Sequence, residues 1–458
     1  MQRDTSWSGE FLATLGLAGP LAAANLLQMM VYAIDVMFVA RLGQEALAVS
    51  SLSVSLFALL VWSASGMVGA VTPLIAAERG RGRHALREIR RSIRMALWLA
   101  VLLAIGAIAI CGEAGAILRA AGEPERIARR AGAFLAVLEW ASLPMIAGSV
   151  LRSFVAAMGR PAFATLITAL AIAINALGNY AFVFGHWGLP ALGLRGSALS
   201  SNCTAWAVVF AYAAAISLDP RLRRYRLFGR WWRADRERFA ELVRIGTPIA
   251  LTIVAEGGLF GSAAFLMGLL SEVQLAAHSL ALQIAAFAFQ LPMGIGQAAT
   301  IRVGLHYGAG DRAGIARAGW MAVAIGVGFS LAGAGLMIFA PRLLLSAYVD
   351  VTAPANAAMI GHASRFLAVA AAFQLADGAQ TIAAGALRGL QDTRVPMAIA
   401  LAGYWLPGFG AAVGLGFATP LAGLGVWIGL AIGLVVVASL LLRRWSRRES
   451  LGLVAPAG

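Results

Sequence analysis

Residues 25–40 read NLLQMMVYAIDVMFVA, an apolar run that contains a single carboxylate, Asp35. The run belongs to a longer apolar stretch, residues 11–40, and a membrane-spanning helix needs about 20 apolar residues. An ionised acid in hydrocarbon is costly unless it is protonated, paired with a cation or in contact with water. Because the chain keeps an acid here, we expect Asp35 to bind protons or cations inside a membrane.

Two other apolar stretches have the same character. Residues 249–265 read IALTIVAEGGLFGSAAF and contain Glu256, and residues 368–387 read AVAAAFQLADGAQTIAAGAL and contain Asp377. Three acids in stretches that otherwise read as membrane spans make transport the first hypothesis for function.

The composition indicates a polytopic membrane protein. Of the 458 residues, 60% are hydrophobic and 12% are charged, whereas about 25% of a soluble protein is charged. The net charge of +15 invites a nucleic-acid partner, but every basic residue is arginine and the arginines cluster in short loops between apolar stretches. We therefore expect the lipid bilayer, and no nucleic acid, as the partner. Cys111 and Cys203 lack metal-binding spacing, and we expect no cofactor.

The apolar stretches between charged loops number twelve, which predicts an all-α polytopic protein with 12 transmembrane helices. The predicted spans are residues 11–40, 46–77, 92–112, 131–157, 162–184, 195–217, 241–269, 274–305, 317–340, 359–386, 395–416 and 420–442.

Arginine placement predicts the orientation. The 79–94 and 219–244 loops and the C-terminal tail are rich in arginine, whereas the 185–194 and 417–419 loops have none. The 113–130 loop is an exception with four arginines. Because cytoplasmic loops carry the excess of positive residues, we predict that both termini are cytoplasmic. We expect the protein in the inner (plasma) membrane of a bacterium.

The two halves of the chain repeat each other without a gap over their first two spans, at the single offset that aligns Pro20 with Pro248. Further pairs aligned at this offset are Leu47-Ala48 with Leu275-Ala276, Ser51-Leu52 with Ser279-Leu280, Gly66 with Gly294, Thr72 with Thr300, Gly80 with Gly308 and Gly82 with Gly310. Each repeat holds six spans, so both enter the membrane in the same direction and are related by a pseudo-two-fold along the membrane normal.

This repeat predicts the domain organisation. We expect one six-helix bundle at 1–218, a cytoplasmic linker at 219–244 and a second bundle at 245–458. Parallel repeats of this type place the substrate site between the bundles and work by rocking. The linker stretch WWRADRERF, residues 231–239, suits either an amphipathic segment at the lipid headgroups or a solvated charged loop.

Depth estimates group the acids. Glu256 lies 12 residues after Arg244 and Asp377 lies 11 residues before Arg388, which places them about 18 Å and about 16 Å from the predicted cytoplasmic boundary. We predict that the two carboxylates share one cation or proton site. The repeat does not generate this site, since Glu256 aligns with Gln28.

Asp35 is shallower and has its own predicted polar neighbours. Asn175 and Asn179 share a helix face, and Asn202 lies at a similar depth. Carboxylate and amide oxygens suit a hard cation, although a single intramembrane Asn more often forms a hydrogen bond between helices. Two other groups of intramembrane polar residues can be functional or structural. They are Glu139, and the stripe of Gln283, Gln290 and Gln297, which would either line a cavity or join helices.

Several motifs together resemble one transporter family. They are Pro20…Asp35…Arg41-Leu42-Gly43, the repeated Gly/Thr pattern before Gly80, and Leu387-Arg388-Gly389 with Asp392-Thr393 and Pro396. Nearly the whole chain is similar to the multidrug and toxic compound extrusion (MATE) transporters, and the acids at Glu256 and Asp377 resemble the NorM-like branch.

The resemblance implies two bundles in a V shape and export of amphipathic organic cations, driven by Na⁺ or H⁺. We expect the protein to be a monomer. It implies a cation site, for Na⁺ in some members, at Glu256 and Asp377, and a first-half site at Asp35 with Asn175 and Asn179. The weaker candidates for cavity-lining residues are Gln28, Asn202, Thr204, Gln283, Gln290, Phe373 and Gln374. Phe373 stands where the family often has tyrosine.

Other function classes fit less well. A lipid-linked precursor or polysaccharide flippase of the same superfamily is the alternative, but those relatives usually have more spans and a cationic cavity. An enzyme is not expected, because the five histidines are scattered. The chain has no GxxxxGK[ST] loop, which disfavours an ATP-driven pump.

Overall fold

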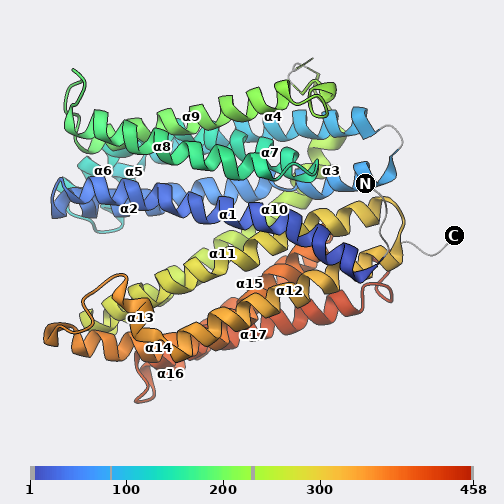
Figure 1. Ribbon diagram of the computed structural model, residues 1–458. Helices are drawn as coiled ribbons and strands as arrows, with labels where there is room; N and C mark the ends of the chain where they lie inside the picture. The colour runs from blue at the N-terminus through green and yellow to red at the C-terminus, as the bar shows by residue number, and fades with distance from the viewer. Residues whose placement is uncertain (1–5, 83–84, 228, 230–232, 455–458) are drawn as a thin grey trace. The chain divides into compact units, whose positions relative to one another are not determined.

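The computed structural model describes residues 6–82, 85–227, 229 and 233–454, and this part of the chain is helical with short connections (Figure 1). Twelve segments within it are long and apolar enough to cross a membrane. The predicted all-α class and number of spans are therefore confirmed. Trp231 and Trp232, for which the sequence left open a place at the headgroups or in a solvated loop, lie outside the described residues.

The elements follow the predicted spans closely. They are α1 (Trp7–Ala40), α2 (Gln44–Val68), α3 (Val71–Arg81), α4 (Ala85–Gly112), α5 (Ala114–Ala120), α6 (Glu125–Leu138), α7 (Ser142–Ala157), α8 (Ala162–Phe184), α9 (Leu194–Leu218), α10 (Arg236–Leu270), α11 (Glu272–Gly308), α12 (Arg312–Phe339), α13 (Pro341–Ser346), α14 (Ala357–Gly389), α15 (Arg394–Gly403), α16 (Phe409–Phe417) and α17 (Gly423–Ser446), with short 3₁₀ helices η1 (Glu139–Ala141), η2 (Arg223–Tyr225) and η3 (Pro354–Asn356) and a π-helix η4 (Tyr404–Gly408).

The chain forms two compact units, and their boundaries fall inside α1 and α10. Unit 1 comprises Met1–Ala22 and Leu251–Gly458, and unit 2 comprises Ala23–Ala250. The two boundaries are equivalent in the repeat, since each lies two residues after one of the aligned prolines, Pro20 or Pro248. The first part of each long helix thus packs with the other repeat. The predicted bundles at 1–218 and 245–458 stay a prediction. The contacts divide the chain into units within α1 and α10, and not in the 219–244 loop.

Glycine allows the close packing that this exchange requires in both units. In unit 1, a Cβ at Gly294 of α11 would lie 2.7 Å from the backbone nitrogen of Ala22 in α1. In unit 2, a Cβ at Gly246 of α10 would lie 2.3 Å from the carbonyl oxygen of Met67 in α2. Real Cβ atoms do not approach backbone this closely. The helices therefore meet backbone to backbone, as small residues permit in membrane proteins.

A network of charges fixes the start of α10 in unit 2. Arg238 donates to Glu78 at 2.8 Å and to Glu88 at 2.9 Å. One turn earlier, Arg91 donates to Asp235. The hydrogen bond from Arg91 holds the pKa of Asp235 below its ordinary value, although burial acts in the opposite direction. These contacts attach α10 to α3 and α4.

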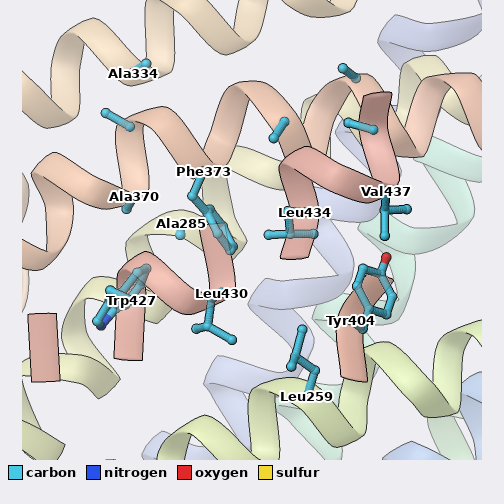
Figure 2. Close-up of a cluster of buried hydrophobic side chains, with 14 of the residues drawn as sticks. Leu259, Ala285, Ala334, Ala370, Phe373, Tyr404, Trp427, Leu430, Leu434 and Val437 are labelled. Atoms are coloured by element: carbon cyan, nitrogen blue, oxygen red, sulfur yellow. The ribbon is translucent and has the colours of Figure 1, made fainter. Parts of the chain in front are cut away.

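The core of unit 1 surrounds α14. Buried aromatic and aliphatic side chains from α10, α14 and α17 meet there, and Figure 2 shows Phe373 and Trp427 together with Leu259, Leu430 and Leu434. Thr300 of α11 donates its hydroxyl to the carbonyl oxygen of Gly385 in α14 at 2.9 Å. The packing places α14, which carries Asp377, at the centre of unit 1 rather than at its surface.

Candidate ion- and substrate-binding sites

Asp35 of α1 lies in a polar cluster of unit 2. Its Oδ1 accepts hydrogen bonds from Asn175 Nδ2 at 3.0 Å and from Asn179 Nδ2 at 2.7 Å. Its Oδ2 accepts from the hydroxyl of Ser201 at 3.3 Å. Three donors on one carboxylate favour its ionised form and hold the carboxylate in a fixed orientation.

The two asparagines reach Asp35 because they are one turn apart on α8 and both are fully buried. Asn179 Nδ2 also contacts the carbonyl oxygen of Asn175 at 3.0 Å. Among the described residues, Asn179 Oδ1 is a buried acceptor with no hydrogen-bond partner. An unpaired buried oxygen beside a carboxylate is suited to a small cation.

Close packing of α8 and α9 brings Ser201 to the cluster. A Cβ at Gly178 of α8 would lie 2.5 Å from the hydroxyl oxygen of Ser200 in α9. The hydroxyl of Ser200 itself donates to the carbonyl oxygen of Asn175 at 3.0 Å. Sequence reasoning did not select Ser201, because a serine in a membrane helix gives no strong signal. Its position one residue before the candidate Asn202 was the available signal.

The structure does not bring Asn202 to Asp35. Its Nδ2 donates to the carbonyl oxygen of Val137 in α6 at 2.7 Å and to that of Ala198 at 3.0 Å. Successive residues on a helix point about 100° apart. For this reason Ser201 faces Asp35 on α1, whereas the neighbouring Asn202 faces α6. Thr204 donates to the carbonyl oxygen of Ser200 at 2.9 Å. Both side chains serve helix packing in this structure.

Two other first-half candidates are separate from these contacts. Glu139 lies in η1 with a 9% exposed side chain, and its Oε2 would be 4.0 Å from a Cβ at Gly112 of α4. Gln28 is half-buried on α1, seven residues before Asp35.

Asp377 of α14 is the centre of the polar group in unit 1. It is 3% exposed, and its Oδ1 accepts from Gln380 Nε2 at 3.0 Å. Glu256 of α10 is close enough for its charge to act on Asp377. The proximity predicted from depth is thus present in the structure. Arg388, in the last turn of α14, is a cation whose charge acts on Glu256.

Gln380 and Tyr404 extend this group, and sequence reasoning missed both. Tyr404 is 2% exposed, interacts with the Gln380 side chain and lies within electrostatic range of both carboxylates. It begins the π-helix η4, which contains Pro407, and π-bulges often occur at functional sites. The signals available in sequence were the spacing of Gln380, one turn from Asp377, and a tyrosine inside a predicted span.

The buried amides of α14 provide free oxygens. Gln374 is 1% exposed with both amide atoms unpaired among the described residues, and Oε1 of Gln380 is also unpaired. No group of three or more His, Cys, Asp or Glu side chains converges within the described residues. A cation at Glu256 and Asp377 would therefore take its remaining oxygens from amides and hydroxyls, as hard cations do.

The remaining second-half candidates differ in exposure. Phe373 is 2% exposed and packs edge to face with Phe260 and with Trp427, each at 5.9 Å between ring centroids, as Figure 2 shows for Trp427. Gln283 of α11 is exposed, and Gln290 donates to the carbonyl oxygen of Ala286 at 3.0 Å. The glutamine stripe therefore does not form one continuous buried lining.

The profile of one family, described as MatE, matches the chain twice, at residues 20–181 and at residues 248–413. The chain belongs to the MatE family. The two matches begin at Pro20 and Pro248, the same pair of prolines that aligns the repeat. The proteins of this family are transporters and not enzymes.

MATE relatives cover almost the whole chain. A probable multidrug resistance protein NorM of Mesorhizobium japonicum is 46% identical over 446 residues, which cover 97% of this chain and 96% of the relative. A solved outward-facing conformation of a multidrug resistance MATE family transporter of the MOP superfamily matches with a TM-score of 0.86 at 19% identity, covering 98% of this chain and 97% of the other.

A second solved structure has the same fold with a different binding pocket. It is a MOP superfamily transporter from Pyrococcus furiosus, for which the reverse polarity of the pocket suggests a different function. The TM-score is 0.84 at 20% identity, and the match covers 97% of this chain and 96% of the other. The fold alone therefore leaves the substrate class open, and the charge of the buried groups must decide it.

Proposed function

We propose that this chain is a secondary active multidrug antiporter that exports amphipathic organic cations in exchange for Na⁺ and/or H⁺ by rocker-switch alternating access. The observation that carries the proposal is the presence of carboxylates inside the apolar helices of both units, at the half-buried Asp35 and at the buried Asp377 with the half-buried Glu256. Their negative sign supports a cationic substrate over an anionic one such as a lipid-linked phosphate. The multidrug resistance names of its relatives support the same substrate class.

The mechanism is competition for the buried carboxylates. A proton or Na⁺ neutralises the acids and favours one packing of the helices, whereas a cationic drug is held by the free carboxylates in the other. Each ligand shifts the equilibrium only by its difference in affinity for the two states. We also propose that the protein works as a monomer in the bacterial inner membrane with both termini cytoplasmic, in agreement with its arginine-rich loops.

The coupling ion is tested in vesicles that contain the purified protein. With ethidium or a similar cationic dye as substrate, Na⁺ and pH gradients are imposed separately and together. We expect dye movement against its gradient with at least one of them, and no movement when both are collapsed with ionophores. Dye transport that depends on neither gradient would rule out the antiporter.

The Asn179→Ala variant separates the two coupling ions, because its effect has opposite signs for them. A hydrogen bond to a charged group is worth about 1.5–3 kcal/mol, and each 1.4 kcal/mol is a factor of about ten in binding. Without the Asn179 donor, Asp35 holds a proton more tightly, so the pH of half-maximal efflux rises by about one unit. Without the Asn179 Oδ1 ligand, Na⁺ binds about tenfold more weakly.

The matched variant for this experiment is Asn202→Ala, since Asn202 donates to the carbonyl oxygens of Val137 and Ala198 and not to Asp35. We expect it to lower stability without moving the dependence on either ion. Equal behaviour of the two variants would show that the contacts of Asp35 do not determine ion binding.

A further inference from the structure

The starts of α1 and α10 carry charges at equivalent places in the repeat, with opposite signs. Glu10 in α1 aligns with Arg238 in α10 at the offset that aligns the two prolines. One partner of each is also equivalent, since Glu78 at the end of α3 aligns with His306 at the end of α11, whereas Arg302 aligns with Leu74. We call residues 7–22 of α1 and 236–250 of α10 the crossing segments, because each packs with the opposite repeat.

Both crossing segments are held by ion pairs of low exposure. In unit 1, Glu10 Oε1 accepts from Arg302 Nε at 2.7 Å, Glu10 Oε2 accepts from Arg302 Nη2 at 2.5 Å, and His306 Nε2 lies 3.5 Å from Glu10 Oε2. In unit 2, Arg238 Nη2 lies 2.8 Å from Glu78 Oε1. The side chains of Glu10 and Glu78 are 2% and 5% exposed.

The signs of these charges distinguish the observed pairing from its alternative. If each crossing segment packed with its own repeat, Glu10 would face the acid Glu78. In the same arrangement Arg238 would face the basic residues Arg302 and His306. The alternative pairing thus sets like charges against each other at both helix starts, which disfavours it.

Stability alone does not account for such pairs. Removing two charges from water costs several kcal/mol per ion, so a buried ion pair is often no better than packed apolar side chains. The best-attested use of buried charges is to select one arrangement over another. Pro20 and Pro248 lie inside α1 and α10 just before each change of unit, and a proline inside a helix removes a backbone hydrogen bond and favours a kink there.

We propose that this reversed charge pattern is a latch that holds both crossing segments on the opposite repeat, and that its release is a step in alternating access. The second part rests on the proposed function, because rocking of the repeats must alter the packing of helices shared between the units. Glu10, Arg302 and Arg238 then act as positioning residues.

The latch is tested by distance measurement in the full-length protein in lipid vesicles. In a background with Cys111→Ser and Cys203→Ser, spin labels are attached at Trp7→Cys in α1 and Ala313→Cys in α12, which are both exposed positions of unit 1. Charge reversal by Glu10→Arg places like charges beside Arg302. We expect the population at longer distances between the labels to rise several-fold.

Rescue by the reversed pair keeps the test independent of any damage to folding. The double variant Glu10→Arg/Arg302→Glu restores the attraction and should return the distances to those of the parent. Glu125→Arg breaks the exposed pair with Arg119, at 3.3 Å, and should change nothing. A Glu10→Arg distribution like that of the parent, or a double variant no better than the single one, would overturn the latch.

The inverted combination gives a second, more specific result. In Glu10→Arg/Arg238→Glu, each crossing segment is attracted by its own repeat and repelled by the opposite one. We expect the long-distance population to exceed that of either single variant. The measurement needs no substrate or gradient, so a chain that fails to export dye still reports on the latch, and the two proposals fail separately. A population no larger than in the singles contradicts the charge pattern.

Discussion

Asp377→Asn is expected to reduce dye efflux to the level of vesicles without protein, while the amount of protein in the membrane stays the same. Asparagine has the shape of aspartate and its Oδ1 can accept the Gln380 hydrogen bond, which in the parent measures 3.0 Å. The fold is therefore preserved. What is lost is the negative charge, and a neutral amide neither releases a proton nor balances a drug cation. A neutral side chain at this position therefore gives the ion and the drug no difference in affinity between the two conformations, and such a difference is what drives the cycle.

The control for this variant is Asp350→Asn. Asp350 is an exposed acid in the loop after α13, where its carboxylate accepts hydrogen bonds from Thr352. The same chemical change there should leave efflux intact. Efflux of Asp377→Asn is compared with the parent at equal protein per vesicle, under the gradient that drives the parent best. Undiminished efflux would remove Asp377 from the mechanism and leave Asp35 and Glu256 as the candidate coupling acids.

Gly246→Val is expected to prevent stable folding. A Cβ at this position would lie 2.3 Å from the carbonyl oxygen of Met67, a backbone atom that cannot turn away. Overpacking of this kind typically costs about 1–3 kcal/mol and can cost more, and here it separates α10 from α2 in unit 2. We expect most of the monodisperse protein to be lost after detergent extraction, and a lower melting temperature in the remainder.

The same helix offers a matched control in Gly261→Val. Gly261 is exposed, and a Cβ there would meet nothing within 4 Å. Both changes replace a helical glycine of α10 by valine, so they alter helix propensity alike. The difference between them in yield and melting temperature isolates the contact with Met67. Similar losses in the two variants would mean that the close approach of α10 and α2 is not required.

Hydrophobic length and periodicity were sufficient to predict the spans. In the part of the chain that the structure describes, the twelve apolar stretches form twelve helical segments, because a backbone in lipid must satisfy its own hydrogen bonds. The repeat was equally visible, since glycine, proline and threonine mark fixed backbone features. The similar depth of Glu256 and Asp377 followed from counting residues, because the rise per residue converts sequence separation into distance along a membrane helix.

Side-chain direction was much harder to predict. Asn202 was expected beside Asp35 at the right depth, but its position on α9 points it to α6 and gives the contact to Ser201. Depth along a helix comes from counting residues, whereas rotation about the helix axis depends on how neighbouring helices pack. Gln380 and Tyr404 were missed for the same reason, since only the tertiary structure places their helices together.

The sequence by itself indicated a membrane protein of two six-span repeats with three acids inside apolar stretches. Those properties depend on local hydrophobicity and on repeated residues, and neither depends on how the helices pack against one another. The tertiary structure decided where each long helix changes from one repeat to the other. That exchange depends on backbone contact at Gly246 and Gly294 and on ion pairs between residues far apart in sequence, such as Glu10 and Arg302.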